Sequence, residues 1–156
     1  MWYYQTVDRF RFQINDLGSA GAGGTETVVN ADNLGSPSTA TWYFLVATYN
    51  AGTNTISLSV NDGTADTASH SGGAYNGAAQ FRIGAIQYPT IESYFDGLID
   101  QVAIWKRVIT GSEITQLYNS GNGLAYTSWT GETITMDKWY NQGPMTPPRK
   151  KRVISY

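Results

Sequence analysis

Short runs in which apolar residues occupy every second position limit what this chain can fold into more than any other feature. Residues 9–14 and 55–60 both have this period of two, with polar or charged residues in between. The apolar positions are Phe10, Phe12, Ile14, Ile56, Leu58 and Val60. Such a period gives a β-strand one apolar face. The Asn61-Asp62-Gly63 triplet follows the second run and supplies residues that tolerate the positive φ of a tight hairpin, so the pattern predicts antiparallel strands.

The composition supports a folded β-rich domain and excludes several chemistries. Hydrophobic residues make up 41% of the chain and charged residues only 14%, so the chain can fill a core. The absence of cysteine excludes disulfides, thiolate zinc sites and cysteine nucleophiles. The single histidine, His70, lies in a polar stretch, and we interpret it as a solvated loop residue.

Four further strands and one helix are predicted from local patterns. The strands are residues 25–29, 42–49, 81–85 and 98–105. The helix is residues 112–119, because Thr110 and Glu113 form a capping-box pattern and Ile114 and Leu117 follow on one face. We expect Ile114 and Leu117 to pack on an edge of the strands. The residues expected to be largely buried are Trp42, Phe44, Val46, Ile56, Leu58, Phe81, Ile83, Val102 and Ile104.

Three segments carry a resemblance to a known family. They are Trp42-Tyr-Phe-Leu-Val-Ala-Thr-Tyr49, Phe95-Asp-Gly-Leu-Ile-Asp-Gln-Val-Ala-Ile-Trp105 and Val108-Ile-Thr-Gly-Ser-Glu-Ile-Thr-Gln-Leu-Tyr-Asn119. Each resembles a segment of laminin-G-like (pentraxin-like) domains in the concanavalin A-like lectin/glucanase superfamily. The resemblance implies an all-β fold, an antiparallel two-sheet jelly-roll sandwich with one short helix near residues 112–119. It implies a sandwich domain over residues 1–126, followed by a C-terminal extension or arm over residues 127–156.

The resemblance begins near Asp8, whereas domains of this family usually begin several strands earlier. We therefore expect the opening strands to be missing, which predicts a sheet with an unpaired edge. Unpaired edges attract strands from other chains. We expect a homo-oligomer or another assembly, with a strand added by a neighbour or by residues 133–136 of the chain's own extension.

The spacing of the carboxylates indicates whether the resemblance extends to the hydrolytic activity of the glucanases. Glucanases of the superfamily carry a Glu-x-Asp-x-x-Glu strand, which places a nucleophile and an acid on one face. No such run is present, and the nearest pair is Asp96 and Asp100, with Gly97 between them. We therefore predict no catalytic residues and no enzymatic activity; the alternative is a glycoside hydrolase of the glucanase type.

Two kinds of binding site are predicted from residue types alone. Aromatic rings and amides recognise sugars, and the glycan candidates are Tyr75, Asn76, Tyr88 and Tyr94; ordinary exposed tyrosines are the alternative. Oxygen donors suit calcium, as in rim sites of the resembled family. The calcium candidates are Asn61, Asp62 and Asp96, with Asp66 and Asn76 as further donors, and turn formation is the competing interpretation. No cofactor is expected to be required.

The charges are divided between an acidic body and a basic tail. Residues 1–148 carry six Lys and Arg against twelve Asp and Glu, and four cations follow. The tail residues expected to contact a partner are Arg149, Lys150, Lys151, Arg152, Ile154 and Tyr156. From residue 143 onward we predict an extended arm on the acidic surface of a neighbouring subunit, with a frayed tail as the alternative. Four cations on an acidic protein do not favour specific nucleic-acid binding.

These observations favour a non-enzymatic structural or glycan-adhesion module of an extracellular assembly. Domains of the resembled kind occur in bacterial surface proteins and in bacteriophage structural proteins. The sequence has no apolar run of membrane-spanning length and no recognisable signal peptide. We therefore expect an extracellular or virion location and no membrane partner.

Overall fold

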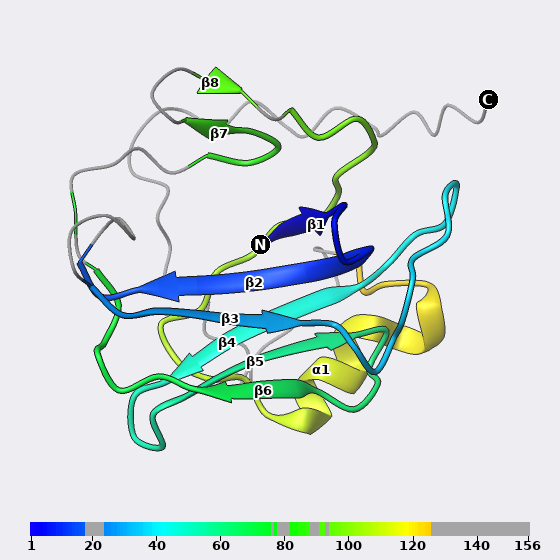
Figure 1. Cartoon of the computed structure of the whole chain (residues 1–156). Helices are drawn as coiled ribbons and strands as arrows, with labels where there is room; N and C mark the ends of the chain where they lie inside the picture. The colour runs from blue at the N-terminus through cyan, green and yellow to red at the C-terminus, as the bar shows by residue number, and fades with distance from the viewer. Residues whose placement is uncertain (18–23, 76, 78–81, 88–90, 93, 126–156) are drawn as a thin grey trace, which may run out of the picture.

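The computed structural model describes residues 1–125, apart from 18–23, 76, 78–81, 88–90 and 93. Two three-stranded antiparallel sheets pack together, and one helix and a two-stranded ribbon lie beside them (Figure 1). The first sheet has the order β1 (Trp2–Tyr4), β2 (Arg9–Asn15) and β3 (Glu26–Asn30). The second has the order β4 (Leu45–Asn50), β5 (Thr55–Val60) and β6 (Asp66–Ser69). The ribbon is β7 (Ile86–Gln87) with β8 (Ile91–Glu92).

The two runs of period two form β2 and β5, the middle strands of the two sheets. The predicted hairpin after β5 is confirmed, because Asn61 and Asp62 both have positive φ, 53° and 58°. The Gly63 N–H then donates to the Val60 carbonyl at 2.9 Å and closes the turn into β6. At β5, alternation and turn chemistry therefore agree locally, whereas β2 combines alternation with antiparallel neighbours on both sides.

The core lies between the two sheets. Ile56 and Leu58 of β5 are completely buried, as predicted. Val29 and Ala31, at the end of β3, complete the core with Val60. Half-buried apolar residues surround it, namely Phe10, Phe12, Ile14, Leu34, Tyr43, Leu45, Ala47, Tyr49 and Ala68. The predicted all-β class, a sandwich of two antiparallel sheets with one short helix, is confirmed.

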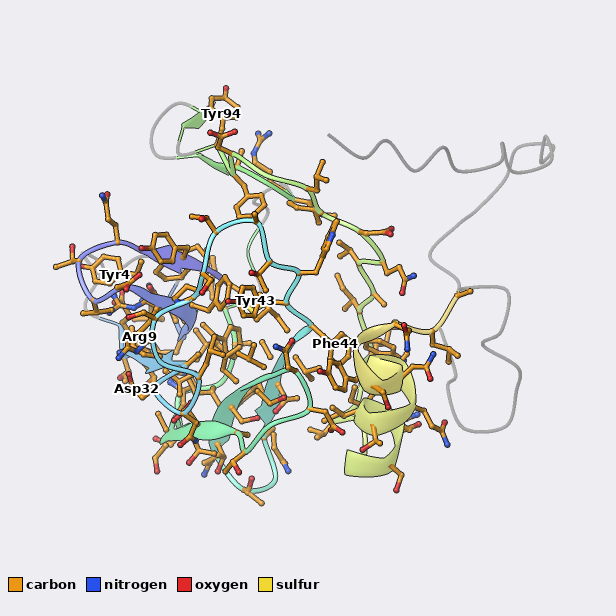
Figure 2. The ribbon with its side chains drawn as sticks, turned by 90° about the vertical axis from the view of Figure 1, so that its right-hand side faces the viewer. Tyr4, Arg9, Asp32, Tyr43, Phe44 and Tyr94 are labelled. Atoms are coloured by element: carbon orange, nitrogen blue, oxygen red, sulfur yellow. The ribbon has the colours of Figure 1, made fainter. Side chains whose placement is uncertain are left out.

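The helix α1 (Gly111–Tyr118) starts where the capping box predicts. The Thr110 hydroxyl accepts the Glu113 N–H, and the Glu113 carboxylate accepts the Thr110 N–H at 2.7 Å. Leu117 is buried and Ile114 half-buried. The Tyr118 ring lies 5.9 Å from the Phe44 ring, which connects the helix to the chain just before β4, and Figure 2 shows Phe44 beside the helix. Asn119 ends the helix in the left-handed conformation (φ 47°), and a 3-10 turn, η2 (Asn119–Gly121), follows.

Two predicted strands are wrong. Residues 82–85 form no strand, and neither do residues 98–105; Phe81 lies outside the described residues. Residues 94–105, called the open segment below, pair with no other described strand, and Gln101 within it has a positive φ of 51°. A strand needs a partner for its backbone groups, and alternation alone does not supply one. The extension predicted over residues 127–156 also lies outside the described residues.

The predicted burial fails in the same region. Ile83, Val102 and Ile104 are exposed, and so is Trp42, which precedes β4 rather than lying within it. Phe44 and Val46 are only half-buried. All six are apolar and were therefore predicted to be core residues, but four stay exposed and two are covered only in part, Phe44 by Tyr118 of α1.

His70 corrects a third prediction. It is only 1% exposed, and its ring is held from both sides. The Thr27 hydroxyl lies 2.8 Å from Nδ1, and the Gly73 carbonyl lies 2.7 Å from Nε2. A carbonyl only accepts, so Nε2 carries a proton and donates to Gly73, while Nδ1 shares a hydrogen bond with the Thr27 hydroxyl. His70 is thus a buried connector between β3 and the chain after β6, which its polar neighbours in the sequence do not reveal.

Candidate functional site

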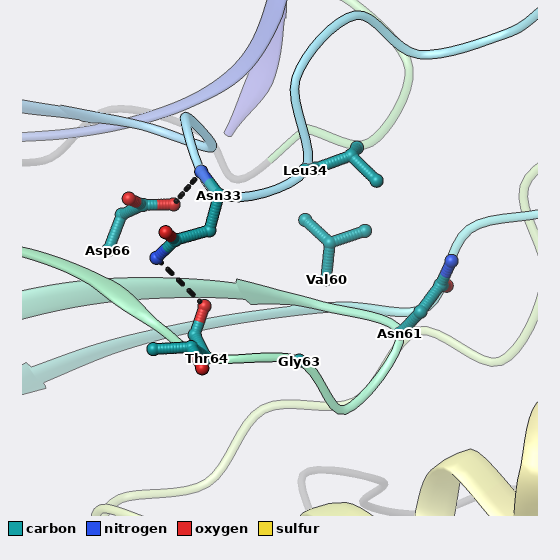
Figure 3. A pocket seen from close by; sticks show the side chains of 7 residues that line it. All are labelled: Asn33, Leu34, Val60, Asn61, Gly63, Thr64 and Asp66. Atoms are coloured by element: carbon teal, nitrogen blue, oxygen red, sulfur yellow. Dashed lines mark hydrogen bonds between the residues drawn. The ribbon is translucent and has the colours of Figure 1, made fainter.

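A pocket of about 430 Å³ opens at one end of the sandwich, between the loop after β3 and the turn from β5 to β6 (Figure 3). Its volume lies in the range typical of small-molecule sites. Seven residues line it, namely Asn33, Leu34, Val60, Asn61, Gly63, Thr64 and Asp66.

Hydrogen bonds hold the two sides of this rim pocket together. The Asn33 N–H donates to Oδ2 of Asp66 at 3.0 Å, and the Asn33 side-chain amide donates to the Thr64 carbonyl at 3.3 Å. These hydrogen bonds join segments that are more than 30 positions apart in the sequence. The site is preorganised by the packing of β3 beside β6 rather than by any local motif.

Asn61 fixes the third side of the pocket. Its Oδ1 accepts the Phe44 N–H at 2.9 Å, and its own N–H donates to the Phe44 carbonyl at 2.8 Å. This pair of bonds orients the amide, and the Nδ2 group has no hydrogen-bond partner among the described residues.

The rim pocket therefore offers polar groups beside an apolar wall. Within the described part of the chain, Oδ1 of Asn33 and Oδ1 of Asp66 also have no hydrogen-bond partner. Leu34 and Val60 form the apolar wall (Figure 3). Acceptors, an amide donor and an apolar wall together suit a ligand with hydroxyl groups on one side and C–H groups on another.

The predicted tyrosine platform is not assembled by the described residues. Tyr75 and Tyr94 are both exposed, but neither lines the rim pocket. The ring contacts among the described residues do not pair them. Tyr94 lies near β7 and β8, well apart from Asp32 and the loop after β3 (Figure 2). Asn76 and Tyr88 lie outside the described residues.

Comparison with protein families assigns the fold. The family model described as the concanavalin A-like lectin/glucanases superfamily matches residues 2–115. The chain belongs to this superfamily. No curated protein and no solved structure gives a significant match. The match starts at β1, which the sequence pattern did not identify because its three residues are too few to show a period.

Lectins bind sugars and glucanases hydrolyse them, so superfamily membership alone leaves both activities open. Asp96 and Asp100 lie in the open segment, and both are exposed. Oδ1 of Asp100 accepts the Gln101 N–H at 2.8 Å. Neither carboxylate lines the rim pocket. The rim pocket is therefore not a site in which this pair could act.

The calcium candidates are divided between two places. Asn61 and Asp62 form the turn after β5, and Asn61 also lines the rim pocket. Asp96 is exposed in the open segment and does not line that pocket. The described residues contain no cluster of three or more His, Cys, Asp or Glu side chains suited to a metal ion. Calcium binding at these residues stays a prediction.

A short ion pair between described residues, Arg107 and Glu113, has a structural role. Glu113 is buried, and both its oxygens accept from Arg107, at 2.8 and 2.6 Å. The Arg107 guanidinium and then the Thr110 N–H lower the pKa of Glu113 from 4.5 to about 2. This pair secures the start of α1 and does not line the rim pocket.

Sequence reasoning named only part of the rim pocket. Asn61 and Asp66 were identified as oxygen donors, but Asn33, Leu34 and Thr64 were missed. Nothing near Asn33 in the sequence predicts its contact with the β5–β6 turn. Separately, the described residues contain no helix with the length and apolar character needed to cross a bilayer.

Proposed function

We propose that this protein is a non-enzymatic glycan-adhesion module that binds a saccharide in the rim pocket. We further propose that it serves as a structural domain of an extracellular assembly, such as a bacteriophage virion. Two observations support the proposal, namely membership of a superfamily that includes lectins and a rim pocket with polar and apolar lining.

The observation that carries the proposal is the combination of groups in the rim pocket. The Asn33, Asn61 and Asp66 side chains offer acceptors and an amide donor, and the Leu34–Val60 wall offers an apolar surface. A pyranose has hydroxyl groups around its edge and C–H groups on its face, so it matches both. Hydrogen bonds already fix Asn33 and Asn61, which reduces the entropy lost on binding.

A glycan array with pocket variants tests this function. Thr64→Phe fills the rim pocket, and Asp66→Asn removes its charge while keeping an acceptor for the Asn33 N–H. Thr67→Phe places the same ring on the exposed surface of β6 as a matched control. We expect the two pocket variants to bind at least tenfold more weakly and the control to bind normally. Full binding by both pocket variants would exclude this pocket, and no binding to any array glycan would overturn the function.

The alternative is a glycoside hydrolase that uses Asp96 and Asp100. Incubation with a panel of β-glucans, followed by reducing-sugar analysis, distinguishes the two functions. We expect no turnover above a heat-inactivated sample. Turnover that disappears in Asp100→Asn would replace adhesion with hydrolysis as the function.

We propose that assembly uses the basic tail. Residues 1–148 carry an excess of six negative charges, to which the cations at positions 149–152 are complementary. Sedimentation of the full chain and of a chain lacking residues 143–156 tests this arrangement. We expect salt-sensitive oligomers that become smaller on truncation, whereas unchanged oligomers would leave the tail without a role in assembly.

A further inference from the structure

The loop after β3 carries two of the residues that line the rim pocket. Residues 31–36, called the pocket loop below, follow the end of β3 and contribute Asn33 and Leu34. Asn33 is exposed, although its backbone N–H and its side-chain amide both donate to the β5–β6 side of the pocket. Hydrogen bonds at an exposed position compete with water, so on their own they hold a loop only weakly.

Arg9, the first residue of β2, contacts the pocket loop on both sides of these two residues. Its Nε lies 3.4 Å from Oδ1 of Asp32, and Figure 2 shows the two residues beside each other. Its Nη1 donates to the Ser36 hydroxyl oxygen at 3.2 Å. Asp32 comes directly before Asn33, and Ser36 follows Leu34 by two positions. Arg9 therefore holds the loop that carries the pocket residues, but it does not itself line the rim pocket.

The turn from β1 to β2 holds Arg9 in place. Nη1 of Arg9 also donates to the Asp8 carbonyl at 2.8 Å. Asp8 has a positive φ of 54°, and Oδ1 of its carboxylate accepts the Tyr3 hydroxyl at 2.7 Å. Hydrogen bonds from the Ser36 side chain and then from Tyr3 lower the pKa of Asp8 below its ordinary value of 3.8. The turn thus reaches the pocket loop both through Arg9 and through Ser36.

We propose that Arg9 is a positioning residue for the rim pocket, which keeps the pocket loop against the turn from β5 to β6 before any ligand binds. The planar guanidinium suits this role because its donors point in fixed, separate directions and reach Asp32 and Ser36 together. A lysine ammonium is a point charge and does not reproduce that geometry. The consequence for saccharide affinity rests on the proposed function, whereas the position of Asn33 can be measured in the free protein.

Amide hydrogen exchange of the free, full-length protein, followed by NMR, tests the positioning itself. The Asn33 N–H donates to Asp66, so its exchange reports whether the pocket loop stays in place. We expect Arg9→Gln to accelerate this exchange about three- to fivefold, as the loss of a surface ion pair implies, and Arg9→Lys to have a smaller effect. Asp32→Asn removes the same ion pair at an exposed residue and should act in the same direction, so it tests the proposal even if Arg9→Gln fails to fold.

Arg11→Gln is the matched control. Arg11 lies two positions further along β2 and carries the same charge, but it contacts Asn30 and the Tyr4 ring rather than the pocket loop. A change that only lowers global stability should therefore act as Arg11→Gln does, and we expect this variant to leave the Asn33 exchange unchanged. Unchanged exchange in Arg9→Gln, or equal acceleration in Arg11→Gln, would overturn the proposal.

Saccharide binding by the same variants separates this inference from the proposed function. With a saccharide that the natural chain binds on the array, we expect Arg9→Gln to lose affinity about three- to fivefold, Arg9→Lys to lose less and Arg11→Gln to bind normally. Faster Asn33 exchange together with unchanged affinity would overturn the role of Arg9 in binding. If the natural chain binds no saccharide, the proposed function fails, whereas faster Asn33 exchange in Arg9→Gln still supports the positioning of the pocket loop.

Discussion

The packed sheets and the open segment have similar apolar sequences but opposite environments. Leu58, in the middle of β5, is completely buried, whereas Ile104 in the open segment is 65% exposed. Both belong to runs in which apolar residues alternate with other types. The difference is that β5 has a hydrogen-bonded neighbour on each side and the second sheet against its face. Alternation makes a segment competent to form a strand, and the partner makes it one.

The largest difference between the two regions should appear when a core leucine is truncated. Leu58→Ala removes a completely buried side chain, and we expect a loss of about 2–5 kcal/mol in unfolding free energy. Leu17→Ala is the same chemical change at an exposed position and should alter it by less than about 0.5 kcal/mol. Urea denaturation measures both. Equal effects would mean that the sheets are no better packed than the loops.

His70 tests whether the packed region continues beyond β6. His70→Leu would leave the Thr27 hydroxyl and the Gly73 carbonyl without their ring partner, at a cost of about 1–3 kcal/mol. His70→Gln keeps an N–H donor for the carbonyl and should cost less. Thermal unfolding compares the two variants. If His70→Leu unfolds at the same temperature as the natural protein, the hydrogen bonds of His70 do not stabilise the fold. The packed region would then end with β6.

The Glu113–Arg107 pair tests the stability of the chain that follows the open segment, where it holds the start of α1. The folded-state pKa of Glu113, about 2, lies below its ordinary value of 4.5. Its ionised form therefore stabilises the fold fully above pH 4.5, and this contribution is lost as the pH falls from 4.5 towards 2. We expect Glu113→Gln to melt below the natural protein at pH 7 and the two melting temperatures to converge near pH 2.

Thr110→Ala provides the matched control for that experiment. It removes the cap hydroxyl but keeps the Arg107–Glu113 ion pair, so the pH dependence should persist at a lower melting temperature. A constant difference between Glu113→Gln and the natural protein from pH 7 to pH 2 would contradict the assigned charge.

The smallest expected effect concerns the outer edge of the packed region. The Arg11 guanidinium lies 3.6 Å from the centre of the Tyr4 ring, which joins β1 to β2. Tyr4→Leu keeps an apolar side chain but removes the ring face, and we expect a loss of about 0.5–1 kcal/mol. Arg11→Gln should cost a similar amount, and the double variant should cost little more than either single change. Additive losses would show that the two side chains act separately.

The parts of the fold that the sequence predicts are those in which neighbouring residues determine the outcome. The turn at Asn61 and Asp62 and the capping box at Thr110 depend on contacts within a few residues, and the alternation that marks β5 is equally local, although the pairing that completes this strand is not. The rim pocket depends instead on Asn33 reaching Asp66. Likewise, burial of His70 depends on Thr27, which lies 43 positions away. Such distant contacts leave no period or motif in the sequence.

The strand order has a kinetic consequence. Every hydrogen-bonded pair in the two described three-stranded sheets joins strands that follow each other in the chain. Each sheet is therefore a meander of two hairpins, and hairpins form in about 1–10 μs. Neither meander must wait for a distant strand, so its loop-closure cost is small. We therefore expect the slow step to be the docking of one completed meander on the other, which brings together Val29, Ile56 and Leu58 and expels water from between them.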